Sequence, residues 1–305
     1  MKHVSLKFLA PLSLIILLGA GCAGSTPSEK INTTEKTSAI KTTTEPVENP
    51  AAENEHADGD HIAKLAGSRV DLKNRNNLKT GLSDLSFQLY GEDGHAFGPD
   101  DLKTTHEKKL HFLIVRDDMT QFQHVHPEFK NNLWTVATTI PKQGNYQFYV
   151  DIAPVEEQIS VLRIPVVIGG STQDATAPVP NSDLSAQDGD YKAVVSIESP
   201  VRTKETKSWT FALTKNGQPV ANVNPYLGAY GHVVELRHGD QDDFFHVHPV
   251  TKDQPKDGKV VFEGTFPSKG RYTLYAQFDI DGSIKTFPIT LDVNEEGKAS
   301  PSAKH

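Results

Sequence analysis

The sequence predicts an all-β protein made of two tandem immunoglobulin-like β-sandwich domains. Short apolar runs with alternating character recur along most of the chain, and no segment shows a sustained helical period. A long segment also occurs twice, and each copy of about 100 residues has the length of one such sandwich. Together these observations favour a duplicated β-sandwich over a helical or α/β architecture.

The repeat relates residues 67–170 to residues 190–294, which we expect to be the two domains. Matching positions keep the same order in both copies, so only loops differ in length. The matched pairs include Phe87 with Phe211, His111 with His232, His124 with His246, His126 with His248, Tyr146 with Tyr272 and Pro165 with Pro288. Such conserved order indicates duplication of a whole domain.

Each copy contains several predicted strands. The alternating runs cover 85–90, 110–115, 134–140 and 146–152 in the first copy, and 193–197, 209–213, 260–266 and 272–278 in the second. Asp-Gly and Asn-Gly pairs between runs predict hairpin turns, because glycine accepts the positive φ that these turns need. Pro165 and Pro288 predict edge strands, and Gly-x-Tyr at Tyr146 and Tyr272 predicts a tyrosine corner.

The N-terminal residues 1–21 are typical of a secretory signal peptide, with lysines before an apolar stretch that is too short to span a bilayer. The only cysteine, Cys22, follows directly, as it does in bacterial lipoprotein signals. We therefore expect a lipid anchor on Cys22 and an extracytoplasmic position at the cell membrane. The alternative is ordinary cleavage that leaves a free, exposed cysteine.

Three further segments complete the predicted organisation. Residues 22–66 are rich in Ser, Thr, Glu, Lys and Pro and have too few large apolar side chains to fold, so we expect a disordered tether. Residues 171–189 are the predicted linker between the domains, and residues 295–305 are a polar tail.

Composition excludes several kinds of function. A single cysteine rules out an internal disulfide, a cysteine-rich zinc site and an iron–sulfur cluster. The formal net charge of −8 offers no electrostatic surface for nucleic acid. No nucleophile is paired with a base and no phosphate-binding glycine loop occurs, so we expect no enzymatic activity. Thirteen histidines against two methionines make imidazole the leading functional group.

The histidines recur in one arrangement. In each copy two of them stand at alternate positions of a strand, so they share a face, and a third stands on the preceding strand. If Arg116 opposes Gln121 across the hairpin and Arg237 opposes Asp243, all three histidines of each copy share that face. The predicted clusters are His111, His124 and His126, and His232, His246 and His248. Because Glu235 lies on the opposite face, we expect the histidine face to point into the core of its own sandwich.

Three neutral imidazoles suit Cu²⁺ or Zn²⁺, and the Irving–Williams order favours copper. His106, shortly before His111, is a candidate fourth ligand of the first cluster, whereas the second copy has Leu227 at this position. The first copy is therefore expected to bind metal more tightly. The alternative is that both clusters are structural and are held together by hydrogen bonds alone.

The stretches HEKKLHFLIVRDDMTQFQHVHPEF, PYLGAYGHVVELR and FHVHP resemble the YtkA-like and FixH-like domains of bacterial cell-envelope proteins. This resemblance implies an immunoglobulin-like sandwich outside the cytoplasm, and it implies no defined activity. We therefore expect a membrane-anchored lipoprotein that binds Cu²⁺ or Zn²⁺ for metal handling in the envelope. The alternative is a non-metallated binding or adhesion module with structural histidines.

Overall fold

The computed structural model describes residues 68–295 apart from 157, 171–175, 177 and 240–243, and all described residues fall within one compact unit. The helical elements of these residues are two 3-10 turns, η1 (Arg75–Asn77) and η2 (Pro99–Asp101). No helix with the length and apolar character needed to cross a bilayer occurs in this part of the chain. The predicted signal peptide, Cys22 and the tether lie outside the described residues.

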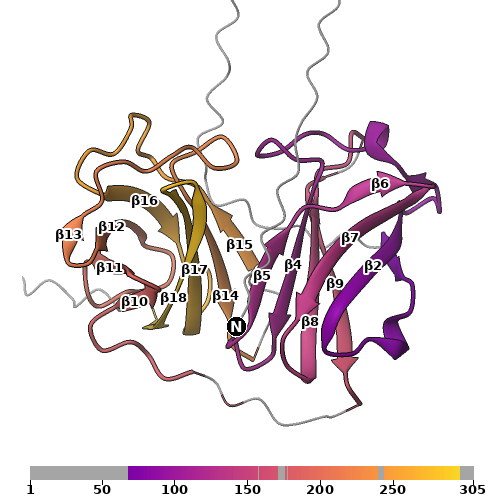
Figure 1. Ribbon diagram of the computed structural model, residues 1–305, viewed down its shortest axis with the longest axis horizontal. Helices are drawn as coiled ribbons and strands as arrows, with labels where there is room; N and C mark the ends of the chain where they lie inside the picture. Colours follow the sequence, from indigo (N-terminus) through magenta and orange to yellow (C-terminus); the bar gives the residue numbers. More distant parts are fainter. Residues whose placement is uncertain (1–67, 157, 171–175, 177, 240–243, 296–305) are drawn as a thin grey trace, which may run out of the picture. The chain divides into compact units, whose positions relative to one another are not determined.

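Domain one is a sandwich of two antiparallel sheets (Figure 1). The first sheet joins β1 (Arg69–Leu72), β2 (Gly81–Tyr90), β3 (Ala96–Phe97), β6 (Glu128–Lys130) and β7 (Leu133–Ile140). The second sheet has the order β5-β4-β8-β9 and comprises β4 (Leu110–Arg116), β5 (Phe122–Val125), β8 (Gly144–Ile152) and β9 (Ser160–Ile168). Apolar side chains of both sheets form one core.

Domain two repeats this architecture with its own core. One sheet joins β10 (Ser185–Asp188), β11 (Tyr191–Ile197), β12 (Thr206–Lys215), β13 (Gln218–Pro219) and β16 (Lys259–Thr265). The other sheet has the order β15-β14-β17-β18 and comprises β14 (His232–Arg237), β15 (Phe244–Val247), β17 (Gly270–Ile280) and β18 (Ser283–Val293). The predicted fold of two tandem β-sandwiches is therefore confirmed.

Local features expected from the sequence recur in both domains. The hydroxyl of Tyr146 donates a hydrogen bond to the carbonyl of Lys142 at 2.7 Å, and the hydroxyl of Tyr272 donates one to the carbonyl of Ser268 at 3.0 Å. These are the two tyrosine corners. The strands that contain Pro165 and Pro288, β9 and β18, lie at sheet edges, where a missing N–H is tolerated.

The hairpins that carry the histidines have the predicted register. Leu113 pairs with His124 in domain one, and Val234 pairs with His246 in domain two. The backbone N–H of Arg116 donates to the carbonyl of Gln121 at 3.0 Å, as the loop length requires. In domain two the loop residues 240–243 lie outside the described residues, but the ladder keeps the same pairing.

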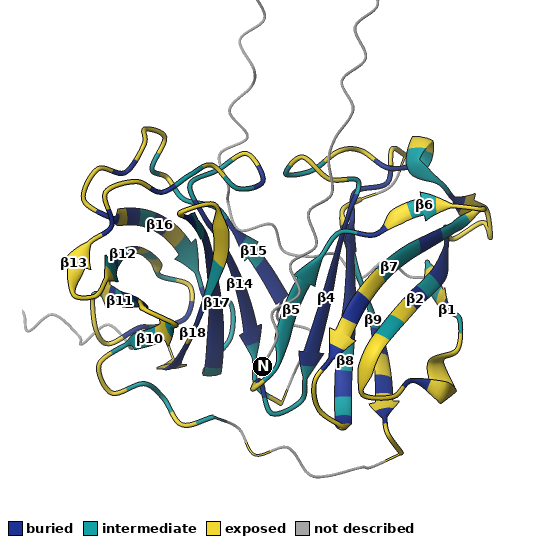
Figure 2. Ribbon diagram, viewed as in Figure 1, coloured by how far each residue is buried: buried dark blue, intermediate teal, exposed yellow. Residues whose placement is uncertain are grey.

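The direction of the histidine face differs from the expectation. Phe112 and Ile114 point into the core of domain one, so His111, Leu113 and Val115 lie on the opposite face of β4. This outer face is also buried, and β4 and β14 are covered along nearly their whole length (Figure 2). The histidine face therefore points out of its own sandwich and is covered by another part of the chain.

The cover is the matching face of the other domain. A third apolar cluster, here called the interface cluster, joins residues of both domains: Leu113, Val115, Met119, Tyr149, Val234, Leu236, Phe244 and Tyr275. Phe122 stacks on Tyr275 with ring centroids 4.0 Å apart, and Tyr149 stacks on Phe244 at 5.4 Å. Phe122 and Phe244 are equivalent residues of the repeat, and so are Tyr149 and Tyr275. The same pair of positions therefore packs together twice, once with each domain supplying the phenylalanine, as in a two-fold symmetric dimer interface.

Candidate metal centre

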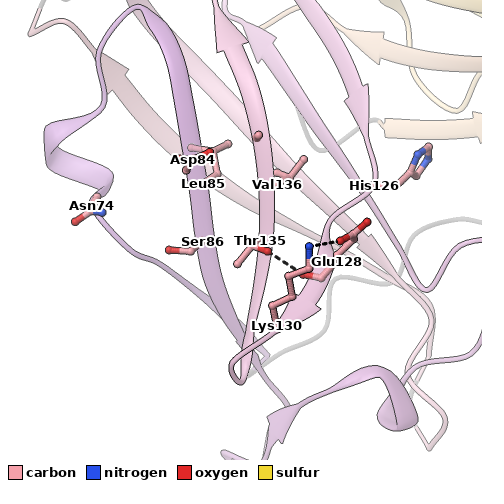
Figure 3. Close-up of a pocket in the computed structure, with 10 residues that line it drawn as sticks. Asn74, Asp84, Leu85, Ser86, His126, Glu128, Lys130, Thr135 and Val136 are labelled. Carbon is pink, nitrogen blue, oxygen red and sulfur yellow. Dashed lines mark hydrogen bonds and ion pairs between the residues drawn. The ribbon is translucent and has the colours of Figure 1, made fainter. Parts of the chain in front are cut away.

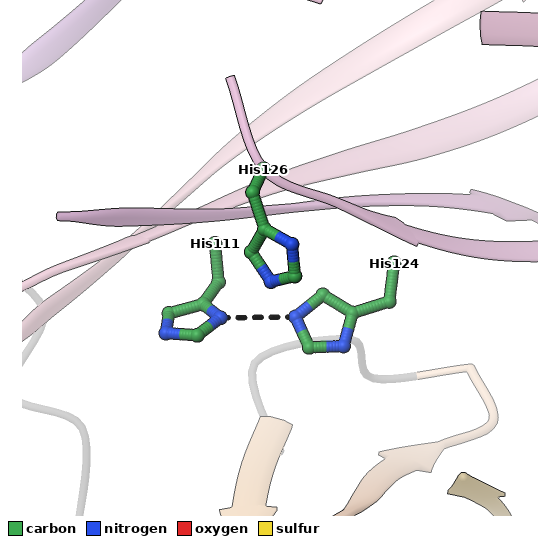
Figure 4. A group of neighbouring side chains, drawn as sticks. All are labelled: His111, His124 and His126. Atoms are coloured by element: carbon green, nitrogen blue, oxygen red, sulfur yellow. Dashed lines mark hydrogen bonds between the residues drawn. The ribbon is translucent and has the colours of Figure 1, made fainter. Parts of the chain in front are cut away.

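The first triad consists of His111, His124 and His126. His111 lies on β4 and His124 on β5, and His126 directly follows the end of β5; one nitrogen from each ring lies within 4.8 Å of the others (Figure 4). Nδ1 of His111 is 3.0 Å from Nε2 of His124. His111 is fully buried, whereas His124 and His126 are partly buried.

The second triad, of His232, His246 and His248, has the same geometry. Its ligand atoms also lie within 4.8 Å of one another, and Nδ1 of His232 is 3.0 Å from Nε2 of His246. His232 is fully buried. The repeated hairpin therefore builds the same three-nitrogen arrangement twice.

The outer nitrogen of the first histidine in each triad faces a backbone carbonyl. Nε2 of His111 is 3.1 Å from the oxygen of Thr105, and Nε2 of His232 is 2.9 Å from the oxygen of Tyr226. A carbonyl can only accept, and a neutral imidazole carries one N–H. The hydrogen therefore sits on Nε2, and Nδ1 presents a lone pair to the inside of the triad.

The second histidine of each triad is oriented in the same sense. Nδ1 of His124 is 2.9 Å from Oε1 of Gln277, and Nδ1 of His246 is 3.4 Å from Oδ2 of Asp151. Nε2 of the second histidine and Nδ1 of the first are 3.0 Å apart in each triad, which is a hydrogen-bond distance. A metal ion could bind between these two nitrogens when the hydrogen of the second histidine moves to its Nδ1, which faces Gln277 or Asp151.

The third histidine of each triad adds a further unsatisfied nitrogen. Nε2 of His126 and Nε2 of His248 are buried and have no hydrogen-bond partner among the described residues. Leaving such an atom unpaired costs about 1–3 kcal/mol. Each triad thus gathers three ring nitrogens within 4.8 Å, of which the third has no hydrogen-bond partner in the described part of the chain.

The electrostatic environment keeps these rings neutral. Burial, followed by the neighbouring histidines, lowers the pKa of His111, His124 and His126 from 6.5 to about 3. The same causes lower the pKa of His232 to about 2 and that of His248 to about 4. Neutral imidazole is the form that ligates a metal. At neutral pH both triads are therefore ready to ligate without losing a proton from the rings.

The geometry fits a tetrahedral ion of the size of Zn²⁺ or Cu²⁺. Two imidazole nitrogens on such an ion, each about 2.0–2.1 Å from the metal, are about 3.4 Å apart. The closest pair in each triad is at 3.0 Å, so a small opening of this pair and a small inward shift of the third ring would complete three bonds.

His106 lies elsewhere than the sequence suggested. Its ring centroid is 5.7 Å from that of His111 but only 3.7 Å from that of His248, in the other domain. The backbone at His106 and Glu107 has positive φ, and Thr105 and Lys108 are paired in a tight turn that projects the ring away from β4. His106 therefore accompanies the second triad, and its nitrogens are not part of either close ligand group.

Sequence reasoning missed Asp151 and Gln277, the outer partners of His246 and His124. They occupy equivalent positions of β8 and β17, directly opposite His111 and His232 in the sheets. A polar residue at the same place of the repeat in both strands was the available signal. Burial raises the pKa of Asp151 from 3.8 to about 7.

Glu235 also has an unexpected position. It is 1% exposed and points into the core of domain two, where its Oε1 has no hydrogen-bond partner among the described residues. Burial raises its pKa well above 4.5. An acidic residue normally indicates the solvent-exposed face of a strand. Glu235 instead lies on the core face of β14, which explains the incorrect expectation that the histidine face points into its own sandwich.

Three solved structures illustrate the distant similarities of the chain. They are Salmonella alpha-2-macroglobulin (11% identity, covering 76% of this chain and 15% of that chain, TM-score 0.24), red sea bream transglutaminase (11%, 77% and 32%, 0.23) and a protein of Corynebacterium diphtheriae described as membrane anchored (11%, 79% and 61%, 0.21). The chain thus spans less than two thirds of each, and none of these similarities bears on its function.

The sequence matches no curated protein. It does match one family in two regions, residues 63–168 and 185–295, which are the two copies of the repeat. The family is described as a domain of unknown function, DUF8832. Because the two matches cover most of the chain, this protein belongs to the DUF8832 family.

Proposed function

We propose that this protein binds two Cu²⁺ or Zn²⁺ ions, one in each triad, and handles these metals at the cell envelope from a lipid anchor on Cys22. The observation that supports metal binding most strongly is the gathering of three ring nitrogens within 4.8 Å in each triad, together with a buried Nε2 that has no hydrogen-bond partner among the described residues. A divalent cation at this point would satisfy three nitrogens at once.

The donor set favours borderline cations. Three neutral imidazoles suit Zn²⁺ and Cu²⁺, whereas Ca²⁺ and Mg²⁺ prefer oxygen ligands. The outer N–H groups of the ligating rings are held by a carbonyl and by a carboxylate or amide, which is the usual outer environment of metal-bound histidine. The envelope location is supported by the signal-like N-terminus and the resemblance to envelope domains.

An access route to the first triad supports the same proposal. A groove of about 700 Å³ in domain one has His126 among its lining residues (Figure 3). Asp84 lines the same groove with a carboxylate that attracts cations, whereas Glu128 is paired there with Lys130. An ion can therefore approach His126 from solvent before it reaches the buried nitrogens.

The test is a calorimetric titration of the metal-free full chain with Zn²⁺ and Cu²⁺, with bound metal counted by elemental analysis. His126→Ala and His248→Ala are the informative variants, because the removed Nε2 atoms make no hydrogen bond with any described residue. We expect two ions per wild-type chain, one for each single variant and none for the double variant. His95→Ala is the matched control, since the ring of His95 is exposed and belongs to neither triad.

Two results would contradict the proposal. The wild type could bind no ion stoichiometrically while the histidine variants unfold more easily, which is the behaviour of a structural cluster in a binding or adhesion module. Alternatively, the double variant could still bind two ions, which would place the metal away from the triads.

A further inference from the structure

The two triads are linked across the domain interface by exchanged hydrogen bonds. Asp151 of domain one contacts Nδ1 of His246 in domain two, and Gln277 of domain two contacts Nδ1 of His124 in domain one. Asp151 and Gln277 are equivalent residues of the repeat, opposite the first histidine of their own triad. Each domain thus supplies the outer partner for a ligand of the other domain.

The interface holds these partners in place. The hydroxyl of Tyr275, two residues from Gln277, donates to the carbonyl of Met119 in domain one at 2.8 Å. Tyr275 also stacks on Phe122, which lies on the same strand as His124. The position of Gln277 relative to His124 therefore depends on packing between the domains. Because the contacts are repeated with the domains exchanged, the position of Asp151 relative to His246 depends on the same packing.

The two outer partners differ in chemical class. Asp151 directs a carboxyl oxygen at His246, whereas Gln277 directs an amide oxygen at His124. A carboxylate behind a ligating imidazole raises the basicity of the ring more than an amide does, and Asp151 provides this group at 3.4 Å where Gln277 provides its amide oxygen at 2.9 Å. The second triad consequently has the more basic ligand in His246, although the two triads have identical ligand types.

We infer that the triads form one two-ion centre in which each domain positions a metal ligand of the other, and that Asp151 makes the second triad the tighter site. This inference rests on the proposed function. Asp151 and Gln277 are positioning residues in it, because they act on the ion through His246 and His124. The ranking is opposite to the one expected from sequence.

His106 contributes to the same asymmetry. Its ring covers that of His248 at 3.7 Å, so domain one also shields the second triad. The equivalent residue of domain two is Leu227, which has no nitrogen. His106→Leu should therefore weaken the second site and leave the first unchanged.

The experiment measures each site separately in the full chain. His126→Ala leaves only the second triad intact, and His248→Ala leaves only the first. In each background the dissociation constant for Cu²⁺ is determined by competition with a chelator, and the electron paramagnetic resonance spectrum of the bound Cu²⁺ is recorded. The added changes are Asp151→Asn and Gln277→Glu, with Asp101→Asn as a control for a charge lost from the surface of domain one.

We expect effects that cross the domain boundary. Asp151→Asn should weaken the second site by about 10–100-fold and change its Cu²⁺ spectrum. It should alter the first site, in its own domain, less than twofold. Gln277→Glu should tighten the first site, a gain that general damage to the fold cannot produce. Asp101→Asn should leave both sites as they are.

The possible failures are distinguishable. If the wild type binds two ions but Asp151→Asn and Gln277→Glu leave both dissociation constants within twofold, the exchange is irrelevant to the metal and only this inference is overturned. The same holds if each change acts on the triad of its own domain. If Asp151→Asn does not fold, Gln277→Glu decides the question. If the wild type binds no ion, the proposed function itself fails.

Discussion

The metal-free protein should lose stability steeply in mild acid. Each triad buries neutral histidines whose pKa is lowered by burial from 6.5 to about 3 or less in most cases. In the unfolded chain the same rings take up protons below pH 6.5. The unfolded state therefore binds more protons than the folded state as pH falls below 6.5, and the free energy of unfolding decreases with it.

The size of the effect follows from the number of groups. Each buried histidine contributes up to about 1.4 kcal/mol per pH unit. Asp151 and Glu235 act in the opposite direction, because burial raises their pKa values and the folded state binds their protons first. With six triad histidines and two carboxyl groups of opposite effect, the unfolded state binds about four more protons than the folded state between pH 6 and 5. The free energy of unfolding therefore falls by about 5 kcal/mol per pH unit in this range. A typical stability of about 5–15 kcal/mol would be exhausted within a few pH units.

The measurement is urea unfolding of the metal-free full chain at pH 7.5, 6.5, 5.5 and 4.5, followed by tryptophan fluorescence and circular dichroism. We expect similar midpoints at the two higher values and a sharp fall below them. Saturating Zn²⁺ at pH 7.5 should raise the midpoint, because it binds only the folded state. A stability that stays flat down to pH 4.5 would show that the rings are not buried in neutral form, and the site geometry would be refuted with it.

Three other changes have defined outcomes. Glu235→Ile introduces the residue found at the equivalent position of domain one, Ile114. It should stabilise the chain by about 1–3 kcal/mol in thermal unfolding at pH 8, because it removes a buried carboxyl group with an unpaired oxygen. Destabilisation would mean that Glu235 has a partner. Tyr275→Phe should cost about 1 kcal/mol through the lost hydrogen bond to Met119, and no change would argue against this interface. Cys22→Ala should release the protein from the membrane fraction, whereas continued detergent-sensitive attachment would disprove the lipid anchor.

Local patterns were sufficient for the architecture and for the content of each triad. Alternation within short runs predicted the strands, and the length of the loop between Arg116 and Gln121 set the hairpin register that brings His111, His124 and His126 together. These features depend on neighbours in sequence, so they can be worked out from the chain. The repeat then extends the same reasoning to the second triad.

The orientation and environment of the triads depended on the tertiary structure. Leu110–Arg116 is apolar on both faces, so alternation could not indicate which face meets its own sandwich, and Glu235 pointed to the wrong one. The contact between Asp151 and His246 joins residues 95 positions apart in different domains. Such a contact arises only when two completed sandwiches pack together, because its energy comes from the shared burial of both faces and not from any local segment.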